Sequence, residues 1–352
     1  MSIPYRTRRR ISRIATVLAA LLVVLAVTWL CWVIWLERYV VYTDDGATVD
    51  FNLSAHELNG EVAVPPVAAE NISIYYNEGR DAINTGNEMT QLNGYYIDID
   101  MLQNDMKGIL EDIEILSSGT PVMIDLKGGY GSFYYSSQLP DALQSASVDA
   151  VAVENLIAQL QHKGFYTIAR VSAFRDYYYG LNHVSSGLYM LSRAGLWADS
   201  GGCYWLDPTN ATTLNWVSSI VLELRNKGFD EVLLTDFGFP DSDQYIFNAD
   251  KNEALLKAAQ SLMDTCLNDS FVLSFSVDDP TFALPDGRCR IYLEDIDPKS
   301  VGATAAQVTI ADPEVRLVFI AETNDTRFDA YSVFRSLRSA VELEAQKADA
   351  AK

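Results

Sequence analysis

From about residue 71 onward, short apolar runs alternate with stretches that have helical spacing. The apolar runs are continuous and rich in Val, Ile, Leu, Tyr and Phe, which is typical of strands covered on both faces of a parallel sheet. The pattern therefore predicts an α/β fold. The runs read NISIYY, GYYIDID, PVMIDLK, YTIARVSAF, EVLLTDF, FVLSFSV, RIYLE and RLVFIAE.

Two of the helical stretches are built alike. The first ends at Gly164, and the second begins at a cap, Thr209 or Asn210, and ends at Gly228. Each closes with Lys-Gly-Phe and enters the next strand at once, because glycine supplies the left-handed turn that ends a helix. Repeated helix–strand units of this kind join parallel strands.

Seven or eight strands in roughly 280 residues predict a (β/α)8 barrel, irregular or incomplete, with an open doubly wound sheet as the alternative. The eighth strand is either NISIYY or the weaker run AQVTI. Neither GxGxxG nor GxxxxGK[ST] follows an early strand, so we expect no dinucleotide cofactor and no P-loop phosphate site.

The first 70 residues have a different pattern. Residues 1–13 hold five arginines and no acid, and residues 14–36 form an uncharged apolar run. At about 1.5 Å per residue this run is long enough to cross a membrane, and the arginines place the preceding tail in the cytoplasm. A cleaved signal peptide is the alternative, but its apolar core would be shorter and would end on small residues. We therefore expect a cytoplasmic tail (1–13), a single-pass anchor in the cell membrane (14–36), a stalk (37–70) and an extracytoplasmic barrel domain (71–352).

The balance of charge excludes one class of partner. The chain has 26 basic and 47 acidic side chains, a formal charge of −21. Such a surface repels nucleic acid, which is therefore excluded as a partner.

The cysteines and histidines indicate no metal site. Cys31 lies in the predicted anchor, and Cys203, Cys266 and Cys289 show no zinc-ligand spacing. These three are either buried free thiols or include one Cys266–Cys289 disulfide. A metal-dependent deacetylase, suggested by the paired acids of YTDDGATVDF, is excluded because none of the three histidines lies at ligand spacing from them.

Charged side chains stand at the ends of several predicted strands. In a parallel barrel the carboxyl ends of all strands open on one face, which carries the active site in nearly every characterised enzyme of this fold. Asp125 and Asp236 lie within their apolar runs, where a carboxylate is costly unless it is paired. For any single acid, turn formation or helix capping is the alternative. The charged set is Asp98, Asp100, Asp125, Lys127, Arg170, Arg175, Asp176, Asp236, Glu294, Asp295 and Glu322.

Aromatic residues are dense near the same strand ends. The stretches GGYGSFYYSS (128–137), RDYYYG (175–180) and CYWLDP (203–208) place many rings on predicted loops. Aromatic faces beside carboxylates are typical of sugar-binding clefts, whereas packing under long loops explains any single ring equally well.

Four stretches between residues 93 and 243 occur in a characteristic order: VMIDLKGGYGSFYYSS, YTIARVSAFRD, LWADSGGCYWLDPTN and KGFDEVLLTDFGFPDSD. Together they resemble the glycoside-hydrolase-like barrel domain of membrane-anchored or secreted bacterial proteins. That family has Asp-x-Lys after an apolar strand, an Ile-Ala-Arg strand leading to Phe-(Lys/Arg)-Asp, Trp-x-Asp-Pro, and Gly-Phe-Asp-Glu before a strand that ends in Asp-(Tyr/Phe)-x-Arg-Phe-Pro. The resemblance implies a barrel in which Asp236 is the catalytic acid or nucleophile. It also implies a polar site made of Asp125, Lys127, Arg170, Asp176, Asp207 and Asp236.

The sequence departs from the family pattern at three points. Gly238 stands where the family has arginine, Gly128–Gly129 stands where an acidic pair often follows Asp-x-Lys, and a later Tyr-Pro-Ser-type signature is absent. These departures favour the alternative of a catalytically degenerate barrel that binds glycan or protein partners at the cell surface.

The first hypothesis is a membrane-anchored glycoside hydrolase that acts on a cell-envelope or extracellular polysaccharide. Hydrolysis needs two carboxyl groups, one of them protonated. Asp236 is the first, and its candidate partners are Glu322, Glu294 and Asp125, in that order. Glu322 leads because it closes a strongly apolar strand, where desolvation would keep a carboxyl protonated. The predicted substrate-binding residues are Lys127, Arg170, Asp176, Tyr130, Tyr134, Trp205, Asp207 and Phe239, without cofactor or metal.

Overall fold

The structure is a computed structural model that describes residues 89–268 and 270–344, positions between Leu22 and Trp32, and two short N-terminal strands. The chain divides into two compact units, Met1–Gly79 and Arg80–Lys352. In the first unit, β1 (Val40–Thr43) and β2 (Gly46–Val49) pair antiparallel. This hairpin falls within the segment that the sequence predicts to be a stalk.

Most of the predicted membrane anchor, residues 14–36, lies outside the described residues, and so does the run NISIYY. Among the residues that are described, no helix has the length and apolar character needed to cross a membrane.

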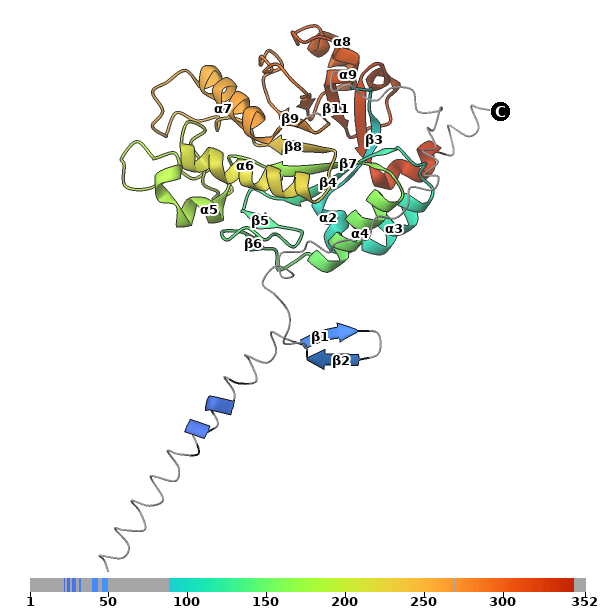
Figure 1. The fold of residues 1–352 in the computed structure, drawn as a ribbon. Coiled ribbons are helices and arrows are strands. Elements are labelled where there is room, and N and C mark those ends of the chain that lie inside the picture. Colours follow the sequence, from blue (N-terminus) through green and yellow to red (C-terminus); the bar gives the residue numbers. More distant parts are fainter. Residues whose placement is uncertain are drawn as a thin grey trace, which may run out of the picture. The chain divides into compact units, whose positions relative to one another are not determined.

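In the described part of the second unit, eight parallel strands close into a barrel (Figure 1). The last strand pairs with the first, and the first pairs with the second, so the ring has no open edge. The predicted barrel is confirmed and the open doubly wound alternative is wrong. The strands are β3 (Asn93–Ile97), β4 (Pro121–Lys127), β7 (Tyr166–Ser172), β8 (Glu231–Thr235), β9 (Val272–Ser276), β10 (Ile291–Leu293), β11 (Leu317–Ala321) and β12 (Ser332–Ser336). Two short strands, β5 (Ser132–Phe133) and β6 (Leu143–Gln144), extend the sheet beside β4.

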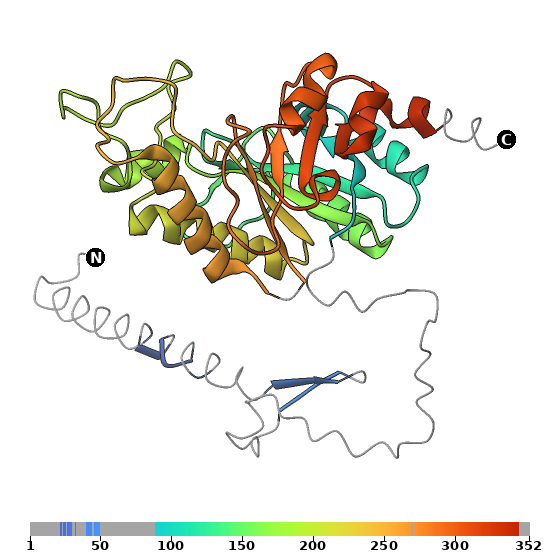
Figure 2. The same cartoon turned by 90° about the horizontal axis from the view of Figure 1, so that it is seen from above.

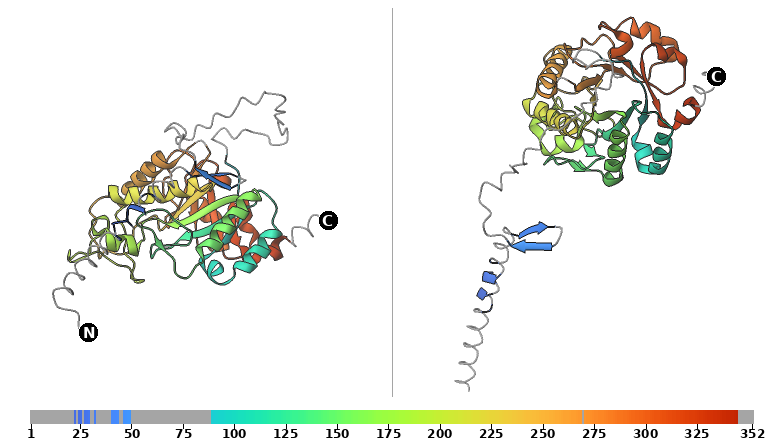
Figure 3. Two further views of the ribbon diagram at one scale, coloured as in Figure 1. Left: turned by 60° about the horizontal axis from the view of Figure 1, so that its bottom comes forward. Right: turned by 45° about the vertical axis from the view of Figure 1, so that its right-hand side comes forward.

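Helices surround the strands unevenly (Figure 3). The longest, α6 and α7, pack against each other on the outside of the barrel (Figure 2). Within the described residues, β9 and β10 are joined without a helix, and β11 and β12 are joined by one 3₁₀ turn. The α-helices are α2 (Ile99–Asn104), α3 (Met106–Glu114), α4 (Ala150–His162), α5 (Tyr177–Asn182), α6 (Ala211–Asn226), α7 (Lys251–Cys266), α8 (Val301–Ala305) and α9 (Pro313–Arg316). The 3₁₀ helices are η2 (Val184–Ser186), η3 (Pro298–Ser300), η4 (Thr326–Ala330) and η5 (Leu337–Ser339).

The two similar helix–strand units form as their sequences predict. The Asn210 side chain accepts a hydrogen bond from Thr212 N–H at 2.8 Å and so caps α6. Gly164 and Gly228 adopt φ of 74° and 92° just after α4 and α6. These left-handed conformations are open to glycine without the strain that a Cβ would cause.

The eighth strand is β12, with the sequence SVFRS, and not the predicted AQVTI. Residues 306–310 form a turn and an irregular segment after α8. Within β12, Ser332 and Arg335 are both buried, and Arg335 Nη2 donates to Asp329 Oδ1 at 2.6 Å. Ser332 and Arg335 interrupt the apolar run of β12, and a continuous apolar run is the signal by which the other strands are recognised.

The three described cysteines, Cys203, Cys266 and Cys289, are buried free thiols. This settles the alternative left open by the sequence, because Cys266 and Cys289 form no disulfide. Burial raises the pKa of the Cys266 thiol to about 11, so this thiol is protonated at neutral pH.

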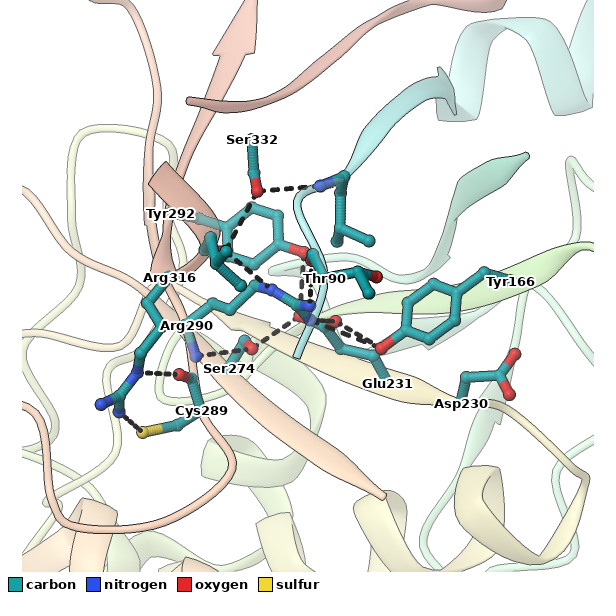
Figure 4. A network of polar contacts seen from close by, with 12 residues as sticks. Thr90, Tyr166, Asp230, Glu231, Ser274, Cys289, Arg290, Tyr292, Arg316 and Ser332 are labelled. Atoms are coloured by element: carbon teal, nitrogen blue, oxygen red, sulfur yellow. Dashed lines mark hydrogen bonds and ion pairs between the residues drawn. The ribbon is translucent and has the colours of Figure 1, made fainter. Parts of the chain in front are cut away.

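A buried ionic cluster joins the starts of several barrel strands (Figure 4). Glu231, the first residue of β8, accepts hydrogen bonds from Ser274 Oγ at 2.6 Å, Tyr292 O–H at 2.8 Å and Tyr166 O–H at 3.0 Å. Its second carboxylate oxygen, Oε2, also pairs with the guanidinium of Arg290. The side chain of Glu231 is 0% exposed and that of Arg290 is 2% exposed, so water does not solvate their charges. Each charge is instead stabilised by the other and by the surrounding hydroxyl groups.

Arg290 ties the same cluster to neighbouring segments. Its Nη2 donates to the carbonyl of Thr90 at 3.1 Å, and its Nε donates to that of Val315 at 3.2 Å. Burial opposes the charge of Arg290, but the Glu231 carboxylate outweighs burial and raises the pKa of the guanidinium. The cluster lies at the amino ends of the strands, the face that in barrels of this kind serves stability.

Candidate functional site

A cleft of about 500 Å³ opens at the carboxyl ends of β4, β7, β8, β9 and β10. The structure thus brings together acids and bases that are up to 170 residues apart in the chain, from Asp125 to Asp295. The charged residues of its wall are Asp125, Lys127, Arg170, Asp236, Asp278, Glu294 and Asp295, and its aromatic residues are Tyr134, Trp205, Phe237 and Phe239.

Arg170 on β7 holds two carboxylates of the cleft. Its Nη1 donates to Asp125 Oδ1 at 2.9 Å, and its Nη2 lies 3.0 Å and 2.9 Å from the two oxygens of Glu294. The Tyr96 hydroxyl donates to Asp125 Oδ2 at 2.6 Å and also accepts from Arg170 Nη1 at 3.0 Å. Because Asp125 lies on β4 and Glu294 follows β10, one cation connects opposite sides of the cleft.

The electrostatics of this cluster keep Arg170 charged and Tyr96 neutral. Burial opposes the charge of Arg170, but Asp125, Tyr96 and Glu294 together raise the pKa of its guanidinium. Burial, followed by the Asp125 charge, raises the pKa of Tyr96, which therefore stays a neutral donor. Arg170 Nε is buried without a hydrogen-bond partner.

The two carboxylates differ in access to the cleft. Asp125 also accepts from the backbone N–H of Ile99 at 3.1 Å, and its side chain is 11% exposed. Glu294 accepts from Ser276 Oγ at 3.1 Å, and its side chain is 32% exposed. A substrate therefore has more access to Glu294 than to Asp125.

Lys127 and Asp176, both predicted to bind substrate, are instead occupied with each other. Lys127 Nζ lies 2.9 Å from Asp176 Oδ2 and 2.9 Å from the carbonyl of Ser172, and both side chains are buried. Asp176 also caps α5 through Tyr179 N–H and accepts from Trp216 Nε1 at 3.2 Å. Their contacts brace β4 against α5, and Asp176 does not line the cleft.

Asp236 stands directly after β8 and is partly exposed in the cleft. Its Oδ2 lies 2.6 Å from Ser172 Oγ, and Ser172 Oγ lies 2.7 Å from the carbonyl oxygen of Arg175. Among the described residues, no lysine or arginine forms a salt bridge with Asp236.

Two acids of the cleft have strained backbones. Asp236 and Asp295, each at the carboxyl end of a strand, have φ of 48° and 57°. A left-handed conformation costs a non-glycine residue about 1–2 kcal/mol, although aspartate tolerates it better than most residues. Strain of this kind is concentrated at functional sites, where surrounding structure holds a side chain in place.

The glycines that depart from the family pattern have different surroundings. A Cβ on Gly238 would meet nothing within 4 Å, so the space for a larger side chain is present. A Cβ on Gly128 would come within 2.3 Å of the Tyr134 hydroxyl, and one on Gly129 within 2.5 Å of Arg175 Nη1. The glycine pair therefore lets Tyr134 and Arg175 approach the backbone next to the cleft.

Three other predicted site residues lie elsewhere. Glu322 is exposed and borders a separate cavity of about 210 Å³, so the desolvation expected of it is absent. Asp207 accepts from Thr209 N–H at 2.8 Å in the turn before α6, and the exposed Tyr130 donates its hydroxyl to the carbonyl of Gly201. Neither of these last two lines the cleft.

Sequence reasoning missed several residues of the cleft. Ser172, Ser276 and Asp278 in its wall were not predicted. Neither was Tyr96, which contacts Asp125 and Arg170. All four lie within or just after apolar runs that were predicted as strands. Polar residues near the carboxyl ends of those runs were the available signal, but serine and tyrosine are too common there to stand out. Among the described residues, no group of three or more His, Cys, Asp or Glu side chains is arranged to hold a metal ion.

Comparison with known proteins gives one family match. The model of a family described as "Putative glycosyl hydrolase domain" matches residues 96–269. No curated protein matches the chain.

Several solved structures are similar to the chain. A hypothetical protein from Ruminiclostridium thermocellum is 20% identical, with a TM-score of 0.45, over 52% of this chain and 96% of that one. An α-galactosidase from Lactobacillus brevis is 10% identical, with a TM-score of 0.48, over 75% of this chain and 41% of that one. The α-galactosidase TtGalA from Thermus thermophilus is 12% identical, with a TM-score of 0.45, over 73% of this chain and 62% of that one. The chain thus spans less than two thirds of the length of either α-galactosidase.

Proposed function

We propose that the protein hydrolyses a glycosidic bond in a polysaccharide, because residues 96–269 match the model of the family described as "Putative glycosyl hydrolase domain", as the sequence resemblance implies. The observation that carries the proposal is the cleft itself, where Asp236 and Glu294 face a common space under different electrostatic conditions. Glycoside hydrolysis needs two such carboxyl groups, one that gives a proton and one that stays ionised.

Ser172 positions the side chain of Asp236 in the cleft. The Ser172 hydroxyl has one hydrogen but touches two oxygens, Asp236 Oδ2 and the carbonyl of Arg175. The hydroxyl is a donor to Asp236 Oδ2 and lies within hydrogen-bond distance of the carbonyl, so it holds the carboxyl group in place at the end of β8. In the proposed mechanism Asp236 is the general acid, and its protonated form transfers the proton to the oxygen of the leaving sugar.

Glu294 is a better partner for Asp236 than Asp125. Arg170 pairs with both carboxylates, but the side chain of Glu294 is more exposed to the cleft than that of Asp125. Strands β8 and β10 are separated only by β9, so their backbones lie about 10 Å apart, and side chains that point inward come closer. Paired carboxyl groups in glycoside hydrolases are about 5–10 Å apart. Glu294 would act on the anomeric carbon or on the attacking water, and Asp125 would position Arg170.

The test is release of reducing ends from cell-envelope and extracellular glycans. Glu294→Gln should lower turnover about 100-fold, because glutamine keeps the size of the side chain but removes its charge. Glu322→Gln is the matched control and should keep wild-type turnover, because Glu322 lies outside the cleft. Equal activity of Glu294→Gln and wild type would remove Glu294 from the mechanism.

One observation favours the second candidate function, a barrel that binds glycan without cleaving it. Arg170 engages both Asp125 and Glu294, so these two carboxylates are well satisfied without a substrate. A glycan that is retained by the wild-type chain without release of reducing ends would support this candidate over hydrolysis.

We further propose that the domain is held outside the cytoplasm by residues 14–36. The support is the sequence alone, with five arginines before an uncharged apolar run. In a flotation assay with lipid vesicles, the full chain should rise with the lipid and a chain without residues 1–36 should not. Equal behaviour of both chains would contradict the anchor.

A further inference from the structure

A second hollow, of about 440 Å³, adjoins the cleft on the side of the loops that follow β7 and β8. Trp205, Phe239 and Asp278 belong to the walls of both spaces. Trp197, Asp199 and Asp241 complete the charged and aromatic part of its wall. Because they share three wall residues, the two spaces lie side by side, and we refer to them together as the groove.

The aromatic rings of this hollow are fixed by neighbouring residues. Trp205 Nε1 donates to Asp199 Oδ2 at 3.1 Å, and Arg175 Nε holds the same oxygen at 2.6 Å. Burial opposes ionisation of Asp199, but these bonds outweigh burial and lower its pKa below the usual value. Asp199 is therefore an anion that orients Trp205.

Trp197 and Phe239 share a different support. Both rings pack on Tyr245, with centroids 5.6 Å and 6.5 Å away, and Lys251 Nζ lies 4.9 Å from the Tyr245 centroid. Tyr245 is buried, whereas Trp197, Trp205 and Phe239 are each half-buried and keep part of their surface towards the hollow. A concave site with prearranged aromatic walls is suited to a flat apolar surface, such as the C–H face of a pyranose ring.

We propose that Trp197, Trp205 and Phe239 form a second sugar subsite, so that the groove takes an extended glycan chain and cleaves it at internal bonds. The proposal rests on the proposed hydrolytic function and names its substrate class. The position beside the cleft sets the occupant, because a chain bound at Asp236 that extends past Trp205 and Phe239 enters this hollow.

The charge of the groove restricts the chain further. Asp241 and Asp278 are exposed and form no ion pair within the described residues. Lys127 and Arg170, the cations in the wall of the cleft, are already paired with carboxylates. A glycan with carboxylate or sulfate groups would be repelled, so the subsite takes uncharged or amino-bearing sugars.

The experiment measures binding in the Asp236→Asn background, so that it does not depend on turnover. The probes are cello-oligosaccharides and glucosamine oligomers of two and six units, with oligogalacturonate of six units as the anionic probe. For cello-oligosaccharides, glucosamine oligomers or both, we expect the hexamer to bind about tenfold more tightly than the dimer. Trp197→Ala should abolish this difference in affinity between hexamer and dimer, and Trp197→Phe should restore part of it. Tyr130 is an exposed aromatic residue outside the groove, so Tyr130→Ala should leave the difference unchanged.

Two outcomes would overturn the subsite. One is the absence of any gain with length for both series, and the other is binding of oligogalacturonate as tight as that of the better hexamer. If the wild-type chain releases reducing ends but shows no gain with length, the subsite fails and hydrolysis stands. If binding depends on length and on Trp197 while no glycan is cleaved, the hydrolytic function fails and the subsite stands without internal cleavage.

Discussion

Asp236→Asn is expected to lower the hydrolysis of natural glycosides about 1,000- to 10,000-fold, the upper part of the range for loss of a general acid. The leaving sugar departs as an alcohol and needs a proton, which asparagine cannot supply. A glycoside with an acidic phenol as leaving group needs little protonation, so its hydrolysis should fall far less. The measurement is the turnover of both substrate types by wild type and variant.

The comparison between leaving groups distinguishes a proton donor from a structural residue. Asp207→Asn is the matched control, because Asp207 only caps the turn before α6 and asparagine caps equally well. Ser172→Ala, which removes the hydrogen-bond partner of Asp236, should lower turnover without abolishing it. Equal losses on both substrate types in Asp236→Asn would rule out proton donation by Asp236.

The second large effect concerns stability and not catalysis. Glu231→Ala should lower the free energy of unfolding by about 3–5 kcal/mol, the cost of breaking a buried ion pair. The variant leaves the Arg290 guanidinium without its carboxylate, and it also leaves the hydroxyl groups of Tyr166, Tyr292 and Ser274 without their shared acceptor. Urea unfolding followed by tryptophan fluorescence measures the change.

A surface ion pair supplies the control for this measurement. Lys107 and Glu111 are 3.1 Å apart with side chains 88% and 66% exposed, so Glu111→Ala should change the free energy of unfolding by about 0.5 kcal/mol or less. If Glu231→Ala has an effect as small as that of Glu111→Ala, the buried cluster does not stabilise the barrel as argued.

Much of the barrel could be predicted because its signals are local. Seven of the strands are continuous apolar runs, and two helices end at glycines that adopt the left-handed conformation their position requires. The eighth strand, β12, could not be identified in this way. Its buried Ser332 and Arg335 are polar, and they form hydrogen bonds with Val315 and Asp329 in the folded chain.

The sequence predicts those site residues that stand at the carboxyl ends of strands, because these ends meet on one face of the barrel. Asp125 and Asp236 stood out because each carboxylate lies within an apolar run, and both line the cleft together with Arg170 and Glu294. Glu322 also closes an apolar strand, but the loop after β11 exposes it to solvent. The pairing of Arg170 with two carboxylates, and of Ser172 with Asp236, depends on the register between strands, which composition and spacing do not encode.

Strand β8 has residues that stabilise the barrel at its start and a residue of the cleft at its end. At its start, Gly228 turns the chain, Phe229 is buried, and Asp230 and Glu231 accept hydrogen bonds from neighbouring strands. At its far end, about 17 Å away at the rise of an extended chain, stands Asp236. The Gly-Phe-Asp-Glu signature therefore marks the architecture of the domain and would persist in a homologue that had lost its acid. A chain that keeps this signature but carries another residue at position 236 is therefore expected to keep the barrel and to lack the proposed proton donor.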